Sequence, residues 1–118
     1  MNDNVYWILE LDVRAGHIEE FRTLKHEMVE AAARESGTLN YEWNLSADEC
    51  TCHIYVRYID SAAVMAHMAG WDNRFAGRFT ALATITRMTV YGAPNAGVKA
   101  ALAPYGPVYF APFGGFKR

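Results

Sequence analysis

Apolar and polar residues alternate along the first stretch of the chain and then change to a helical spacing. Between residues 4 and 13, every second side chain shares one face of an extended segment, as in a half-buried strand. Residues 17–35 instead repeat apolar positions every three or four residues, which predicts an amphipathic helix. Ser36 and Gly37 then form a stop signal, because glycine tolerates the left-handed conformation that ends many helices.

Two further strands follow by the same reasoning. Residues 39–45 and 52–58 alternate again, and the polar stretch 46–49 between them predicts a hairpin turn. Asp60 or Ser61 follows the second of these strands, and either side chain can cap the first turn of a helix. The chain is therefore expected to return into a helix directly after residue 60.

The second helix is predicted from one apolar side. Its members fall at helical spacing and are Val64, His67, Met68, Trp71 and Phe75. We expect Gly70 and Asp72 to break this helix, with a second short helical piece from about Asn73 to Phe79. A fourth strand over residues 83–91 would complete the unit.

This order of elements predicts the fold class. The sequence β-α-β-β-α-β is the split βαβ pattern of the ferredoxin-like α+β sandwich. We assign residues 1–92 to this domain and residues 93–118 to a C-terminal extension with a short helix ended by Pro104. Because the extension is apolar and aromatic, we expect it to pack on the same domain or on a partner subunit.

A homodimer is expected from the uncovered face of the sheet. Helices of this fold cover one face only, and the opposite face would carry Tyr6, Ile8, Glu10, Tyr55, Arg57 and Tyr91. Aromatic side chains with interspersed polar groups suit a contact between two subunits. The alternative is a one-sided sheet with scattered surface tyrosines.

Composition and charge limit the classes of binding partner that we expect. The 118 residues carry a formal net charge of only −2 and show no basic stripe, so nucleic-acid binding is not indicated. No apolar run approaches the length of a membrane span, and the start of the chain lacks the pattern of a signal peptide, so we expect a cytoplasmic protein. Cys50 and Cys52 are expected as reduced, buried thiols, and the four scattered histidines make no metal set.

Two stretches resemble a known family. The run 35–42 is similar to the E-x-G-x-L-x-Y-E start of the second strand in antibiotic biosynthesis monooxygenase (ABM) domains of the dimeric α/β-barrel superfamily. The run 54–67 resembles the third strand and second helix of that family, which end in Ala-His. This resemblance covers about residues 4–92. Two departures stand out, because Val56 replaces a frequent glutamate and no second histidine follows His67.

The resemblance implies a monooxygenase without a cofactor. No dinucleotide, P-loop or zinc-protease motif is present, so an electron-rich substrate would itself supply the electrons. We therefore expect a cofactor-independent monooxygenase acting on a phenolic, quinol-like or polyketide-type aromatic compound. Two alternatives stay open: a non-catalytic dimer that binds a small hydrophobic molecule, and a haem-degrading or haem-binding relative.

Six side chains are the candidates for the site. His67 would be the base, because an imidazole transfers protons near neutral pH, although its spacing alone also fits a histidine packed in the core. Tyr58 would orient a substrate oxygen. The expected aromatic walls are Trp43, Trp71, Trp7 and Phe75. Simple core packing is the alternative for these walls and for Tyr58.

Overall fold

The structure is a computed structural model that describes residues 2–118. Its elements follow the chain in the order β1 (Val5–Val13), α1 (Ile18–Ala33), β2 (Thr38–Leu45), β3 (Thr51–Tyr58), α2 (Ser61–Gly70), the π-helical turn η1 (Trp71–Phe75), α3 (Ala76–Leu82), β4 (Ala83–Gly92), α4 (Ala96–Leu102), the 3-10 turn η2 (Ala103–Tyr105) and β5 (Val108–Phe110). This order confirms the predicted β-α-β-β-α-β unit and adds a helix and a strand after it.

One sheet organises the chain, with the strand order β2-β3-β1-β4-β5. The first four strands pair antiparallel, and β5 joins β4 in parallel. The central strands of this unit are β1 and β3. Helix α1 connects β1 to the outer strand β2, and the second helical segment connects β3 to the outer strand β4, which is the split βαβ connection. The α+β, ferredoxin-like fold predicted from the pattern is therefore confirmed.

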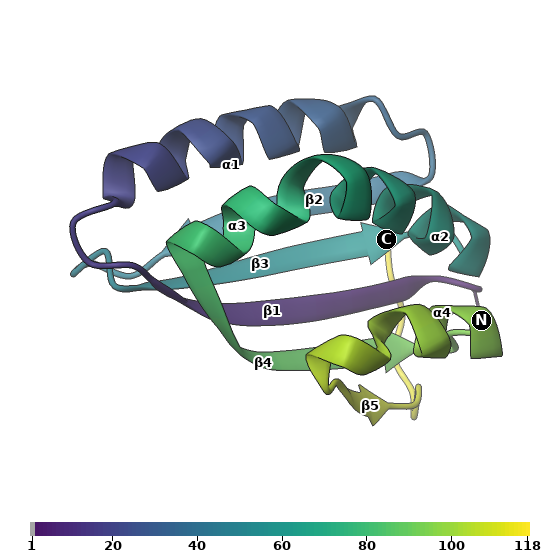
Figure 1. The fold of residues 1–118 in the computed structure, drawn as a ribbon. Helices are drawn as coiled ribbons and strands as arrows, with labels where there is room; N and C mark the ends of the chain where they lie inside the picture. The colour runs from purple at the N-terminus through teal and green to yellow at the C-terminus, as the bar shows by residue number, and fades with distance from the viewer. Residues whose placement is uncertain (1) are drawn as a thin grey trace.

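The helices pack on one face of this sheet (Figure 1). The strand residues on that face are buried, as shown by Trp7 at 5 % exposure and Val56 at 1 %. The helices pack their apolar sides against this face, and Leu24 of α1 and Val64 of α2 are both fully buried. Because burial of apolar area is the main stabilising term, this interface is the core of the domain.

The predicted cap of the second helix forms, and α4 begins with a cap of the same kind. Asp60 accepts a hydrogen bond from the Ala63 N–H at 2.9 Å and so fixes the start of α2. Asn95 accepts one from the Val98 N–H at 2.9 Å and starts α4. Each cap satisfies a backbone donor that the first helical turn leaves free.

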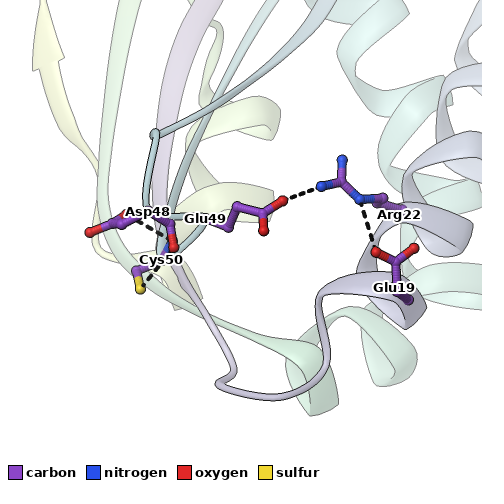
Figure 2. Close-up of polar contacts among 5 residues, drawn as sticks. All are labelled: Glu19, Arg22, Asp48, Glu49 and Cys50. Atoms are coloured by element: carbon purple, nitrogen blue, oxygen red, sulfur yellow. Dashed lines mark hydrogen bonds and ion pairs between the residues drawn. The ribbon is translucent and has the colours of Figure 1, made fainter.

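The hairpin between β2 and β3 is tied to α1 by an ion-pair relay (Figure 2). Arg22 of α1 contacts Glu19 at 3.4 Å on its own helix and Glu49 in the hairpin turn. Glu49 itself has a positive φ of 61° in this turn. These side chains are exposed, so the relay contributes little to stability and serves to orient the turn.

The predicted break in the second helix is wrong. The chain stays helical from Ser61 to Leu82, because the π turn η1 joins α2 directly to α3. Trp71 and Phe75, the first and last residues of η1, are both buried, as is Phe79 of α3. Continued burial of this apolar side outweighs the weak helix propensity of Gly70 and Asp72.

The extension adds to the core on one side and leaves its end in solvent. Val98 and Leu102 of α4 are fully buried against the domain, and α4 packs beside α2. Phe113 and Phe116, beyond β5, are exposed in the single chain. None of the helices within residues 2–118 has the length and apolar character of a membrane span.

The two cysteines lie in different environments. Cys52 is buried, and burial raises the pKa of its thiol to about 11. Cys50 precedes β3 in the hairpin turn and is exposed, so the prediction of two buried thiols is wrong for this residue. The strand β3 begins at Thr51, one residue before the predicted span 52–58, so Cys50 still lies outside it, in the turn.

Candidate functional site

A small cavity lies between the sheet and the second helix. Its volume is about 50 Å³. The lining is almost wholly apolar and consists of Trp7, Leu9, Met28, Tyr41, Ile54, Val56, Tyr58, His67, Met68, Trp71, Phe79, Ile85, Met88, Leu102 and Tyr105. We call this space the inner cavity.

The inner cavity must widen to hold an aromatic ring. An engineered protein cavity that binds benzene measures about 150 Å³, which is larger than the inner cavity. Three flexible methionines, Met28, Met68 and Met88, belong to the lining. Because thioether side chains change rotamer at little cost, their movement is the simplest way to enlarge the space.

A second, larger space of about 250 Å³ adjoins the first, between α1 and the α2–η1 segment. We call it the outer cavity. It shares four lining residues with the inner cavity: Met28, Tyr41, His67 and Trp71. Of the two cavities, only this one is lined by arginine and carboxylate side chains, those of Arg34, Glu35 and Arg74. His67 therefore stands in the wall between an apolar space and a polar one.

A carboxylate orients the imidazole of His67. Helix α2 carries His67, and the turn after α1 carries Glu35, whose Oε1 lies 2.9 Å from His67 Nδ1. Because a carboxylate only accepts hydrogen bonds, Nδ1 carries the proton in the neutral ring and Nε2 is left as an acceptor. The two side chains are 14 % and 27 % exposed, so water competes poorly for this contact.

The charge on Glu35 is favoured by its surroundings. Burial opposes ionisation, but hydrogen bonds from His67 and from Thr38 at 2.7 Å outweigh it, with help from the nearby charges of His67 and Arg74. The net result is a pKa of Glu35 below its ordinary value. An ionised Glu35 holds the imidazole in place and stabilises it when it gains a proton.

The hydroxyl of Tyr58 is a buried polar group without a protein partner. Tyr58 is fully buried at the end of β3, and its hydroxyl finds no hydrogen bond within residues 2–118. Its ring centre lies 5.3 Å from that of His67. Burial raises the pKa of Tyr58 well above its ordinary value, so the group is an O–H donor. Unsatisfied buried donors are rare in cores; the indole N–H of Trp43 is a second one, but of the two residues only Tyr58 lines the inner cavity.

Tyr41 is a further hydroxyl near the imidazole. It stands on β2, lines both cavities, and its ring centre is 5.9 Å from that of His67. Burial also raises the pKa of Tyr41, which keeps this phenol protonated. Two neutral phenols therefore flank one imidazole.

The predicted site residues divide between three places. His67, Tyr58, Trp7 and Trp71 all line the inner cavity. Phe75 lines the outer cavity. Trp43 borders neither, because it packs between Phe21 at 5.5 Å and Phe79 at 6.3 Å and faces a separate hollow near α1.

Three residues of the site were not singled out from the sequence. In the sequence, Glu35 stands out only as the first residue of a family-like run, and Tyr41 only as part of an alternating strand. Tyr105 comes from the extension, and its hydroxyl accepts a hydrogen bond from Trp71 Nε1 at 2.8 Å. Its position at the end of the predicted helix, directly before the Ser36-Gly37 stop, is the signal that the residue pattern offers for Glu35.

The fold and this aromatic-lined site agree with the family that the sequence resembles. The description of the matching family is antibiotic biosynthesis monooxygenase, and its model matches residues 4–87. The match covers most of the chain, which therefore belongs to this family. A search of curated proteins finds no match.

Solved structures of similar fold extend this comparison. MupZ from Pseudomonas fluorescens has a TM-score of 0.89 and 22 % identity, over 100 % of this chain and 91 % of its own. SnoaB, a cofactor-independent oxygenase from Streptomyces nogalater, has a TM-score of 0.66 and 20 % identity, over 79 % and 95 % of the two chains. Rv0793 from Mycobacterium tuberculosis has a TM-score of 0.65 and 23 % identity, over 78 % and 96 %. These identities establish a shared fold.

The three matches differ in whether they include the C-terminal extension. The family match ends at residue 87, and SnoaB covers 79 % of the chain, whereas MupZ covers all of it. The extension thus has a structural counterpart in MupZ. Since Leu102 and Tyr105 line the inner cavity, this segment helps to shape the site.

Proposed function

We propose that the protein is a cofactor-independent monooxygenase acting on a phenolic, quinol-like or polyketide-type aromatic compound. The observation that carries this proposal is the juxtaposition, in one apolar cavity, of the Glu35-oriented His67 and the unpartnered hydroxyl of Tyr58. SnoaB, which has the same fold, is a cofactor-independent oxygenase and supports the same reading.

Under this proposal His67 is the general base. Nε2 accepts a proton from the substrate, and Glu35 stabilises the imidazolium that results. The hydroxyl of Tyr58 donates to the substrate oxygen on which negative charge develops. Trp7 and Trp71 supply flat apolar walls for the ring.

The substrate anion then reacts with oxygen. One electron passes from the anion to O₂, which gives a substrate radical and superoxide, and the two combine into a peroxide. Loss of water from the peroxide leaves a carbonyl group. For an activated methylene the sum is CH₂ + O₂ → C=O + H₂O, so one oxygen atom enters the product and the other leaves as water. The apolar lining keeps bulk water from the intermediates.

Oxygen uptake tests this proposal. Anthrone and a panel of hydroquinones are the probes, with ¹⁸O₂ used to follow incorporation of one labelled atom. His67→Ala should lower the rate by about 10²- to 10⁴-fold, the usual contribution of a general base. His26→Ala, on the exposed side of α1, is the matched control and should leave the rate unchanged.

A non-catalytic binding protein is the second candidate. Val56, at the position where the family often has glutamate, is part of the apolar lining of the inner cavity. Such a lining favours retention of a hydrophobic molecule. Binding of anthrone without oxygen uptake or product, in wild type as in His67→Ala, would select this function over the first.

We further propose that the protein is a homodimer joined through the uncovered face of its sheet. Tyr6 and Tyr91 stack there with ring centres 5.2 Å apart, and the Arg57 guanidinium lies 3.9 Å above the Tyr6 ring. Glu10 lies near His53 and Arg87 on the same face. Pre-ordered aromatic and charged groups of this kind support a subunit contact.

A further inference from the structure

Two arginines line the outer cavity without forming an ion pair in residues 2–118. Arg34 is the C-cap residue of α1 and Arg74 lies in η1, and both line the outer cavity beside His67. Neither makes an ion pair within the part of the chain that the structure describes. Arg22 and Arg78, on the same helical layer, are instead paired with glutamates. The outer cavity therefore carries two positive charges that no ion pair among the described residues neutralises.

The single carboxylate of the outer cavity does not neutralise this charge. Glu35 already accepts hydrogen bonds from His67 at 2.9 Å and from Thr38 at 2.7 Å. With one negative and two positive groups, the outer cavity stays positive while His67 is neutral. Arg74 is also held in place, since its guanidinium lies 4.9 Å from the centre of the Phe75 ring, another lining residue.

The two cavities are positioned for one ligand. They share Tyr41, His67 and Trp71, so a ring placed against Trp71 in the inner cavity directs a substituent past His67 into the outer cavity. The inner cavity is too small for a large ligand, and the outer one is five times its volume. A polycyclic ligand would therefore extend across both.

We propose that the outer cavity is a subsite for a carboxylate carried by the aromatic ligand, bound by Arg34 and Arg74. This inference rests on the proposed function, because it assumes that the aromatic part occupies the inner cavity. Guanidinium groups suit this role, since their planar fork matches the two oxygens of a carboxylate. Such an acidic group would fix which end of the ligand faces His67.

Binding of three related probes tests the subsite by isothermal titration calorimetry. The probes are 6-hydroxy-2-naphthoic acid, its methyl ester and 2-naphthol. We expect the acid to bind about tenfold more tightly than the ester, the effect of two partly exposed ion pairs. The preference should shrink as salt is raised, because exposed charges are screened.

Variants of the two arginines complete the test. The double variant Arg34→Gln/Arg74→Gln should bind acid and ester about equally and should bind 2-naphthol as wild type does. Arg78→Gln is the matched control, since it removes one positive charge from α3 outside both cavities, and it should keep the preference. Equal affinity of wild type for acid and ester, or a preference that survives the double variant, overturns the subsite while the proposed function stands. Failure of 2-naphthol to bind at all overturns both.

Discussion

Individual side chains of the site combine features that folding alone does not favour. Tyr58 keeps a buried hydroxyl unpaired, and Glu35 holds Nδ1 of His67, which leaves Nε2 as the acceptor of the neutral ring. A buried polar group without a partner costs about 1–3 kcal/mol. Proteins commonly retain an unfavourable group of this kind where a ligand completes its hydrogen bonding.

Tyr58→Phe should separate stability from function. Removal of the unpaired hydroxyl is expected to raise the free energy of unfolding by about 1 kcal/mol, measured by urea denaturation. Oxygen uptake should fall at the same time, because the donor to the substrate oxygen is lost. Tyr109→Phe, an exposed tyrosine of β5, is the control. A clear loss of stability in Tyr58→Phe would show that the hydroxyl is satisfied within the protein.

The lowered pKa of Glu35 predicts a pH dependence of stability. A carboxyl group whose pKa is lower in the folded state stabilises the fold above its unfolded value of about 4.5. That contribution is lost as the pH falls through the lower folded-state pKa. Between pH 6 and pH 3, wild type should therefore lose more stability than Glu35→Gln. Glu30→Gln, on the exposed surface of α1, should follow wild type; parallel curves for all three proteins would contradict the assignment.

At the scale of elements, the π turn η1 is the feature that sets the geometry of the site. It carries Trp71, Arg74 and Phe75 around the two cavities without interrupting the helix. Turns of this type are rare and often occur at functional sites. The sequence pattern placed the right residues on one side but predicted a break, because Gly70 and Asp72 are weak helix formers whose effect depends on tertiary burial.

Two glycines, Gly70 at the end of α2 and Gly37 packed against this helix, should respond in opposite ways to alanine. Gly70 is helical with a φ of −68° and has open space where a Cβ would lie, so Gly70→Ala should stabilise the fold by about 0.5–1 kcal/mol. A Cβ on Gly37 would lie 2.5 Å from the Ala63 Cβ, so Gly37→Ala should destabilise it. Thermal unfolding of both variants checks the pair, and an equal response would contradict the packing of α2 on the α1–β2 turn.

Sequence patterning located much of this site for a physical reason. Tyr58 ends a strand whose alternate residues face the helices, and His67 lies on the apolar side of its helix, so periodicity alone directs both side chains inward. Glu35 lies 32 positions away from His67, and only the packing of the α1–β2 turn on α2 joins them. Trp43 shares a face with Tyr41, but β2 lies at the edge of the sheet. Its indole packs against Phe21 and Phe79, and of these three rings only Phe79 lines the inner cavity.

At the scale of the whole molecule, the open sheet face and the extension stand outside the single core. Val98 and Leu102 are buried in the chain's own domain, while Phe113 and Phe116 are exposed. Neither the burial of α4 nor the exposure of the chain end can be predicted from alternation or helical spacing. Both depend on where the extension packs on the four-stranded unit. The uncovered face offers a docking surface for a second subunit.

Sedimentation velocity tests the proposed dimer. Wild type should sediment as a dimer at micromolar concentration. Ile8→Lys places a charge in the middle of the uncovered face and should give a monomer with an unchanged fold. Thr23→Lys adds the same charge on the exposed side of α1 and should stay dimeric. A monomeric wild type, or a dimer that survives Ile8→Lys, would contradict this assembly.

The central claim is that the imidazole of His67 presents a free Nε2 to an aromatic ligand in the inner cavity. Nuclear magnetic resonance of protein with ¹⁵N-labelled histidine tests it most directly. At pH 8 we predict the Nδ1–H tautomer for His67 and a shift of its Nε2 resonance when 2-naphthol is added, with the resonances of His26 unchanged. An Nε2–H tautomer, or an Nε2 resonance that saturating 2-naphthol leaves in place, would contradict the account.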